Sequence, residues 1–502
     1  MKRCVAVIIL LICAVFAGHV NAGLLSGITV RIMALSSSGY EGRFSGSAGG
    51  IKAGEYIAGE FKKLGLQSSI DGSYYQPFDI PVRSPGKNTI VSVAGRELKI
   101  FDDYAPLTVC PSGEVKGVSA EEGDFSGKIA VTRYEESTDE QWLVSKIKEA
   151  ETNGAIALVI LKKELYSDYT VWDGLIPPKL RLRWEKTLGE DMGHFLSMKV
   201  TQKRSLAPPV TSNIPCIMVK EDVYQNTHPH LNPLPEGEEI TLPFKGRDMH
   251  VLSGVEGVGM GFSSEISIKV DIKEENIPAR NVIGYLPGKG KNKDEVIIIG
   301  AHYDHMGLDS KGRHFPGADD NASGVAAMLE VAERLARKGT DRSIIFIAFD
   351  AEEWGLVGSL YYVNHPVIPL DKTVLMINMD TIGRNDPDSI HFLGSKRSPD
   401  VRELAGEIAG KNGLKLLDDI EFAFKYGSDH YPFYGKGVPA IDLTSGYHED
   451  FHKITDTWEK VSTDKVTKVA DFVYTLVERV ADSDIHFQKP LQVEIRSPVR
   501  EH

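Results

Sequence analysis

The sequence predicts an α/β protein, a mostly parallel sheet covered on both faces by helices, with a β-rich unit inserted into it. Uninterrupted apolar runs end at residues 302, 350 and 380 ("EVIIIGAH", "SIIFIAFD" and "TVLMINMD"), as in strands that are buried on both faces. They alternate with helical patterns such as "SGVAAMLEVAERLARKG", which stops at Gly339. Strands alternating with helices are typical of such a sheet, and its ligand sites form beyond the carboxyl ends of the strands.

The β-rich unit is predicted between residues 95 and 252. Its strand-like runs "FSGKIAVTRY", "GAIALVIL" and "SNIPCIMV" are separated by the polar, proline-containing stretch "TVWDGLIPPKLRLRWEK". Before this unit, residues 39–66 read as a glycine-rich loop followed by an amphipathic helix that ends at Gly65.

The first 22 residues have the pattern of a secretory signal peptide. A basic start precedes an apolar run from Val5 to Ala17, and small residues stand at Val20 and Ala22 before Gly23. The run is shorter than the roughly 20 apolar residues that span a bilayer. We therefore expect cleavage near Ala22, export to the periplasm or the exterior, and no stable membrane insertion of the mature chain.

The composition and net charge of the chain indicate which kinds of partner it is unsuited to bind. The chain has 502 residues, ordinary globular proportions (42% hydrophobic, 25% charged) and a net charge of -13, which argues against a nucleic-acid partner. After signal cleavage only Cys110 and Cys216 remain, and in an exported protein two cysteines usually pair, so a disulfide is expected. Neither cysteine has the spacing of a metal ligand.

Side chains that bind metals follow each of the three buried runs. Singly, each has an ordinary structural explanation: a histidine after a strand is commonly a hydrogen-bonding group, and Asp-Asp before Asn-Ala-Ser commonly caps a helix. Their repetition at equivalent positions, in a His, Asp and Glu mixture, instead predicts a zinc site at one sheet edge. The candidates are His302, Asp304, Asp319, Asp320, Glu352, Glu353, Asp380, His448 and His452.

The motifs around these residues resemble the M28 family of co-catalytic metallopeptidases, which includes secreted aminopeptidases and glutamate-carboxypeptidase-like enzymes. They are "HYDH", "PGADDNASG", "DAEEWGLVGS", "NMDTIGR" and "HKITDT", in the family's order. The resemblance implies a three-layer α/β/α, zinc-exopeptidase-like catalytic domain with a mostly parallel or mixed sheet, and an insert similar to a protease-associated (PA) domain. The expected division is signal peptide 1–22, first part of the peptidase domain 23–94, PA-like insert 95–252, catalytic domain 253–485 and tail 486–502.

Carried over position by position, the resemblance implies two zinc ions and a role for each residue. His302 and Asp380 bind the first ion, Glu353 and His452 bind the second, and Asp320 bridges both. Glu352 is the general base, and the Asp304 carboxylate orients the His302 imidazole. His448 is a rival to His452, which fits the spacing to Asp456 and Thr457 better. The Asp320–Asn321 bond resembles one that is cis in relatives.

The chain departs from the family at Phe451, where some relatives have a tyrosine that stabilises the oxyanion. His448 and Tyr426 are the candidates for that task here. Arg384 is either a binding group for a substrate carboxylate or, as the simpler expectation, part of a structural salt bridge.

The expected function is an exported dinuclear zinc exopeptidase, an aminopeptidase acting on a peptide substrate. A carboxypeptidase or dipeptidase of the same fold is the alternative. A cyclase of N-terminal glutamine, which uses one zinc in relatives, fits the complete ligand set less well. A non-catalytic binding protein is disfavoured because all five expected ligands and Glu352 are present.

Overall fold

The computed structural model describes most of the chain between Ser26 and Pro490. The described ranges are 26–68, 72–100, 102–107, 111–121, 124–134, 142–162, 205–206, 212–227, 239–244, 247–252, 264–309, 312–418 and 427–490. The expected signal peptide, Cys110, Tyr426 and the tail from residue 491 lie outside these ranges. Within them, no helix has both the length and the apolar character needed to cross a membrane.

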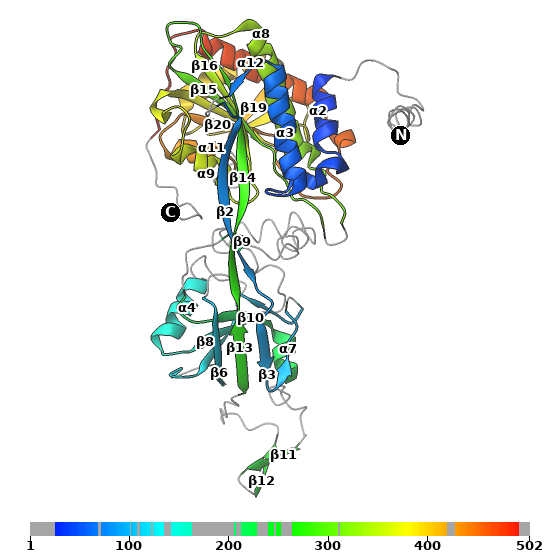
Figure 1. Ribbon diagram of the computed structural model, residues 1–502, viewed down its shortest axis with the longest axis vertical. Coiled ribbons are helices and arrows are strands. Elements are labelled where there is room, and N and C mark those ends of the chain that lie inside the picture. Colours follow the sequence, from blue (N-terminus) through cyan, green and yellow to red (C-terminus); the bar gives the residue numbers. More distant parts are fainter. Residues whose placement is uncertain are drawn as a thin grey trace, which may run out of the picture.

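The larger of two units is built on a mixed sheet, shown at the top of Figure 1. Its strands in spatial order are β19 (Lys415–Asp418), β18 (Ser389–Leu393), β20 (Ala440–Thr444), β17 (Thr373–Met379), β15 (Val296–His302), β16 (Ser343–Phe349), β14 (Ile272–Leu286), β2 (Tyr75–Pro85) and β9 (Ser205–Leu206), with β1 (Gln67–Ser68) also on β14. Strands β16, β15, β17 and β20 are mutually parallel, whereas β14 and β18 pair antiparallel to this block. The predicted α/β class with a mixed sheet is confirmed.

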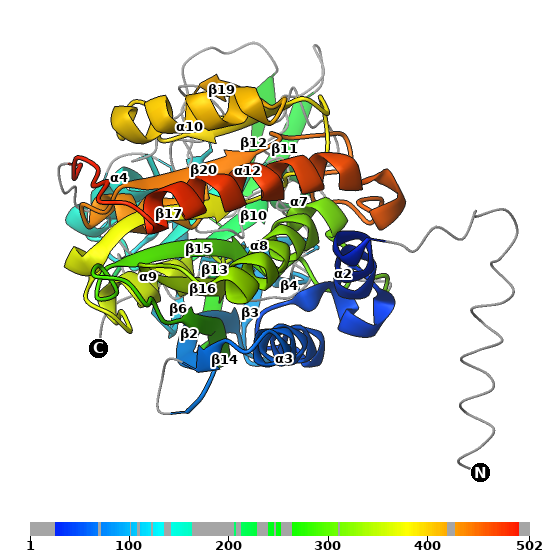
Figure 2. The ribbon, with the colours of Figure 1, turned by 90° about the horizontal axis from the view of Figure 1, so that it is seen from above.

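Helices cover both faces of this sheet because alternate residues of its strands point to opposite sides. Ile297 and Ile299 of β15 pack in one apolar cluster, and Val296 and Ile298 pack in another. The first face carries α2 (Gly27–Leu35), α3 (Ala48–Lys63), α8 (Gly324–Lys338), α10 (Pro399–Lys411) and α12 (Thr463–Ala481). The second carries α9 (Val357–Asn364) and α11 (His430–Gly435). Figure 2 shows α8 and α12 side by side over the strands.

The second unit is a smaller sheet with helices α4 (Trp142–Thr152) and α7 (Glu221–Thr227). Its strands in order are β4 (Arg96–Glu97), β3 (Ile90–Val93), β13 (Glu265–Val270), β6 (Gly113–Ala120), β7 (Ile129–Arg133), β8 (Ala157–Lys162), β10 (Cys216–Lys220) and β5 (Tyr104–Pro106). Strands β3 and β13, which pair antiparallel in this sheet, lie outside the range 95–252 taken for the insert. A separate hairpin joins β11 (Glu239–Phe244) to β12 (Arg247–Leu252).

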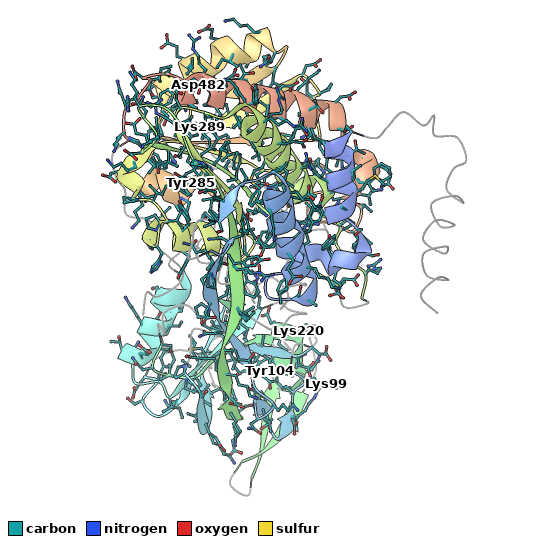
Figure 3. The ribbon with its side chains drawn as sticks, turned by 45° about the horizontal axis from the view of Figure 1, so that its top comes forward. Lys99, Tyr104, Lys220, Tyr285, Lys289 and Asp482 are labelled. Atoms are coloured by element: carbon teal, nitrogen blue, oxygen red, sulfur yellow. The ribbon has the colours of Figure 1, made fainter. Side chains whose placement is uncertain are left out.

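The long antiparallel ribbon of β2 and β14 runs from the first unit toward the second (Figure 1). Because β13 is followed almost directly by β14, the chain passes from one sheet into the other without an intervening helix. Tyr285, near the end of β14, lies in the first unit, and Tyr104 and Lys220 lie in the second (Figure 3).

Cys216 is a free thiol, contrary to the expected disulfide. It is fully buried in an apolar cluster with Leu158 and Ile160 of β8, and its Sγ donates to the Ile214 carbonyl at 3.4 Å. The strand β10 turns this side chain into the core, where a small apolar group fits without a partner cysteine.

Candidate metal centre

Three adjacent parallel strands deliver the candidate residues to one sheet edge. β15 ends at His302, β16 is followed directly by Asp350, and β17 is followed directly by Asp380. The turn η3 (Ala318–Ser323), which leads into α8, adds Asp320. The convergence follows from topology, because parallel neighbours place their carboxyl ends together.

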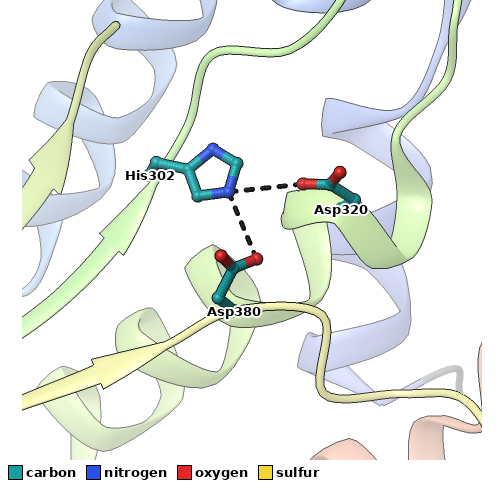
Figure 4. A group of neighbouring side chains, drawn as sticks. All are labelled: His302, Asp320 and Asp380. Atoms are coloured by element: carbon teal, nitrogen blue, oxygen red, sulfur yellow. Dashed lines mark hydrogen bonds and ion pairs between the residues drawn. The ribbon is translucent and has the colours of Figure 1, made fainter. Parts of the chain in front are cut away.

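The first group of ligand atoms joins His302, Asp320 and Asp380 (Figure 4). His302 Nε2 lies 3.3 Å from Asp320 Oδ1 and 3.2 Å from Asp380 Oδ1. On the other side of the ring, Nδ1 lies 3.2 Å from the carbonyl oxygen of Asp304. A proton on Nδ1 donated to that carbonyl leaves the Nε2 lone pair facing the two carboxylates, as a metal ligand requires.

The second group gathers at the other oxygen of Asp320. Asp320 Oδ2 lies 2.8 Å from His452 Nε2, which is itself 3.4 Å from Glu353 Oε1. His305 Nδ1 lies 2.9 Å from the same Glu353 oxygen and 3.8 Å from Asp320 Oδ2. His305 was not selected from the sequence; its only signal is its place as the last residue of "HYDH".

The donor chemistry of both groups suits zinc. In each of the trios His302–Asp320–Asp380 and His305–Asp320–Glu353, the ligand atoms all lie within 4.8 Å of one another, and imidazole nitrogen with carboxylate oxygen is a common zinc set. Burial alone would raise the pKa of Glu353, but His452 and His305 hold it below its usual range. Burial lowers the pKa of His452, but Glu353 and Asp320 outweigh it and raise this pKa to about 10.

The Asp304 carboxylate holds the turn that carries the two glutamates. Its Oδ1 accepts from the Glu352 amide at 3.0 Å, and its Oδ2 accepts from the Glu353 amide at 3.3 Å. We expected this carboxylate to orient His302, but the Asp304 carbonyl oxygen is nearer to His302 Nδ1 (3.2 Å) than Oδ1 is (3.7 Å). Asp304 therefore links the β15 end to the glutamate turn.

Asp350 stabilises the same turn from behind. Its carboxylate accepts from the Tyr303 hydroxyl at 2.9 Å and from the backbone amides of Ala351 and Arg280 at 2.9 and 3.0 Å. Burial and, secondarily, the nearby Asp304 raise the pKa of Asp350 to about 7. Ala351 has a φ of 60°, a left-handed backbone conformation that is uncommon for residues other than glycine, directly before Glu352. Asp350, Glu352 and Glu353, which follow the strand, thus have different surroundings.

Glu352, unlike its neighbour Glu353, belongs to neither ligand group. Burial raises its pKa well above the usual value, Glu353 and Asp380 raise it further, and His302 opposes them. A carboxyl group that binds a proton readily beside a metal site is suited to general base and acid work.

Backbone hydrogen bonds fix the turn of Asp320. Asp456 Oδ2 accepts from the amides of Asp319 and Asp320 at 3.0 and 3.1 Å. Asn321 Nδ2 donates to the Met379 carbonyl at 2.9 Å, which ties the turn to the end of β17. The Asp320–Asn321 peptide bond is cis, as the resemblance implied.

His448 does not face the two ligand groups. Its Nε2 lies 3.4 Å from Asp319 Oδ2, and its Nδ1 accepts from the Asp450 amide at 3.2 Å. Arg384 is held in a salt bridge, with Nη2 2.8 Å from Asp450 Oδ2. The other oxyanion candidate, Tyr426, lies outside the described residues.

Tyr447 lies near both ligand groups and was not among the residues expected from the sequence. Its ring contacts Phe451 edge-on at 4.6 Å between centroids, and Phe451 stacks on His452 at 3.9 Å. Burial raises the pKa of the Tyr447 phenol, and the carboxylates Asp380, Glu352, Asp320 and Glu353 raise it further. The phenol is therefore protonated at neutral pH and lies in the field of both ligand groups.

Comparisons with known proteins find peptidases. Residues 281–477 match the model of peptidase family M28. Aminopeptidase YwaD of Bacillus subtilis is 25% identical over 453 residues, which cover 87% of this chain and 80% of that protein. The glutamate carboxypeptidase 2 homolog of Caenorhabditis elegans is 28% identical over 363 residues, 64% of this chain and 45% of that protein.

Solved structures share the fold. The aminopeptidase from Aneurinibacillus sp. strain AM-1 has a TM-score of 0.58 at 20% identity and covers 94% of this chain and 97% of its own. BSAP, a zinc aminopeptidase from Bacillus subtilis, has a TM-score of 0.55 at 21% identity, with 91% and 95% covered. The matched segment 281–477 contains both ligand groups and Glu352. Residues 281–477 therefore form a segment that matches peptidase family M28, and the chain is a hydrolase of peptide bonds.

Proposed function

We propose that this protein is an exported dinuclear zinc aminopeptidase with Glu352 as its general base. The observation that carries the proposal is that the two oxygens of Asp320 face separate ligand groups, at 3.3 Å from His302 and 2.8 Å from His452. His302 and Asp380 would hold one ion, Glu353 and His452 would hold the other, with His305 beside them. Bound zinc would polarise the scissile carbonyl and lower the pKa of the attacking water.

The chain's own groups then move the proton and stabilise charge. Glu352 takes the proton of the water and passes it to the leaving amine. Its position is set by the hydrogen bond from its amide to Asp304 Oδ1. The Tyr447 hydroxyl donates to the oxyanion of the tetrahedral species, the task that Phe451 cannot perform.

The charges around the centre favour a substrate with a free α-amine. Asp429 is buried near His302 and Asp380, and burial, with Asp304 and Asp380, raises its pKa to about 7. Carboxylates in excess of the ligand set suit an ammonium group. Arg384, the candidate for a substrate carboxylate, is engaged by Asp450. Export is supported by the pattern of residues 1–22, and the smaller sheet is proposed to be the PA-like insert.

A pair of matched peptides, one with a free and one with an acetylated N-terminus, tests this function. The purified mature chain is expected to cleave only the free peptide, and a zinc chelator is expected to abolish that cleavage. Release of free amino acid, measured by mass spectrometry over time, is the readout. Cleavage of the acetylated peptide would move the assignment to a carboxypeptidase or endopeptidase. No cleavage of either in added zinc would favour a binding protein on this scaffold.

Tyr447→Phe is expected to lower kcat by about 10²-fold with little change in KM, because the lost donor acts on charge that develops in the transition state. Steady-state kinetics on the free peptide measure the change. Tyr285→Phe is the matched control, since its hydroxyl contacts Ser343 Oγ at the start of β16, the far edge of the sheet. Equal kcat values for the Tyr447 variant and the wild type would show that Tyr447 has no role in the reaction.

A further inference from the structure

Arg43, far from the metal centre in sequence, is buried beside it. It is the last residue of the turn η1 (Ser38–Arg43), and its side chain is among the largest fully buried ones of the described residues. The guanidinium donates to five backbone carbonyls. They are Tyr303 O (2.8 Å from Nε), Leu35 O and Pro316 O (both 2.7 Å from Nη1), and Gly317 O and Asp320 O (2.9 and 3.4 Å from Nη2).

Four of these carbonyls belong to the two segments that carry metal-site residues. Tyr303 lies between His302 and Asp304, and Pro316, Gly317 and Asp320 form the entry to the bridging carboxylate. Arg43 therefore joins the end of β15 to the turn η3 through one rigid, planar group. A lysine ammonium on this site would have three donors in a compact head and could not reach all of these acceptors at once.

The residues next to Arg43 make further contacts with the same loop. The Arg43 carbonyl accepts from the His305 amide at 3.2 Å, and the Gly42 carbonyl accepts from the Gly307 amide at 2.9 Å. Ser45 Oγ donates to Asp304 Oδ2 at 3.2 Å. Packing is close here, because a Cβ on Gly42 would lie 2.2 Å from the Gly307 carbonyl oxygen. We name residues 42–45 the N-terminal buttress.

The Arg43 guanidinium holds backbone segments in place and does not act on the reacting atoms. Its acceptors are backbone carbonyls, and burial lowers its pKa only to about 10, so it is charged at neutral pH. A charged group that donates to carbonyls of two segments fixes their separation more tightly than neutral hydrogen bonds would. The two oxygens of Asp320 reach both ligand groups only when η3 is held at the right distance from His302.

We propose that Arg43 is a positioning residue of the metal centre and that the N-terminal buttress is part of the site, although it lies outside the segment 281–477 that matches the family. The proposal rests on the proposed zinc site. It states that loss of the clamp lets η3 shift against the β15 end, so that zinc affinity falls even where the fold survives.

Arg43→Lys tests the proposal against Arg342→Lys. Arg342 is also fully buried and donates to the backbone carbonyls of Val480 and Ser483, but it precedes β16 at the opposite sheet edge. Zinc affinity is measured by competition with a chromogenic chelator, and folding is measured by circular dichroism melts of the zinc-free proteins. We expect Arg43→Lys to lower zinc affinity by about 10- to 100-fold relative to Arg342→Lys.

Two further readouts separate positioning from loss of stability. In excess zinc, Arg43→Lys is expected to show lower kcat with nearly unchanged KM, while Arg342→Lys keeps wild-type kcat despite a lowered melting temperature. If Arg43→Lys does not fold, Ser45→Ala provides the test. This variant deletes one hydrogen bond to Asp304 and is expected to lower zinc affinity by about 10-fold. Wild-type zinc affinity in the folded variant, or in Ser45→Ala when Arg43→Lys is insoluble, overturns the proposal. A wild-type chain that binds no zinc overturns the proposed function itself.

Discussion

Glu352→Gln is expected to lower kcat by about 10³-fold while leaving the zinc content of the protein unchanged. Glutamine keeps the size of the side chain and the backbone amide that donates to Asp304 at 3.0 Å, so the turn is preserved. It removes the oxygen that takes the proton of the attacking water. Steady-state kinetics on a free peptide, with zinc measured by elemental analysis, are the readouts.

The neighbouring residue provides the matched control. Glu353 faces His305 and His452 at 2.9 and 3.4 Å, so Glu353→Gln is expected to lose zinc affinity first and activity as a consequence. Added zinc should partly restore Glu353→Gln and should not restore Glu352→Gln. The opposite pattern, with zinc lost from Glu352→Gln and retained in Glu353→Gln, would exchange the two roles.

The strand ends could be predicted because burial leaves a direct mark on the sequence. "VIIIGAH", "SIIFIAFD" and "TVLMINMD" are apolar along most of their length, and the charged or ionisable residue that ends each run marks the sheet edge. The contacts of Asp320 with His302 and His452 were expected on this basis together with the family motifs.

Residues that act through the backbone could not be predicted in this way. Arg43 binds carbonyl oxygens, which every residue has, so no side-chain pattern near Tyr303 or Gly317 points to it. His305 lies within a motif, but its ring direction depends on how β15 ends. Cys216 was expected to pair because two cysteines in an exported chain usually form a disulfide. The direction of its side chain is set by strand β10, and the number of cysteines carries no information on that direction.

Removal of zinc is expected to abolish activity and to lower the melting temperature of the protein. The carboxylates Asp320, Asp380 and Glu353 lie close together only in the folded chain, so a cation bound between them stabilises the folded state. At an ion concentration of about 100 times Kd, one site stabilises by about 2.7 kcal/mol. Differential scanning calorimetry with chelator and with restored zinc measures the effect; an unchanged melting temperature and activity would contradict a metal centre.

The bridging role of Asp320 makes the same experiment more specific. Asp380 lies 3.2 Å from His302 and belongs to the first ligand group. Asp380→Asn is therefore expected to weaken the binding of one ion and to leave the affinity for the other ion near the wild-type value. Asp320→Asn is expected to weaken the binding of both ions, because its oxygens face both groups.

Zinc must also displace protons from His302 and His452, whose pKa values are raised by neighbouring carboxylates, so zinc affinity should fall as pH falls. Titration calorimetry in buffers of different ionisation enthalpy measures how many protons are released and how many ions are bound. If Asp320→Asn still binds one ion with high affinity, the two sites are independent.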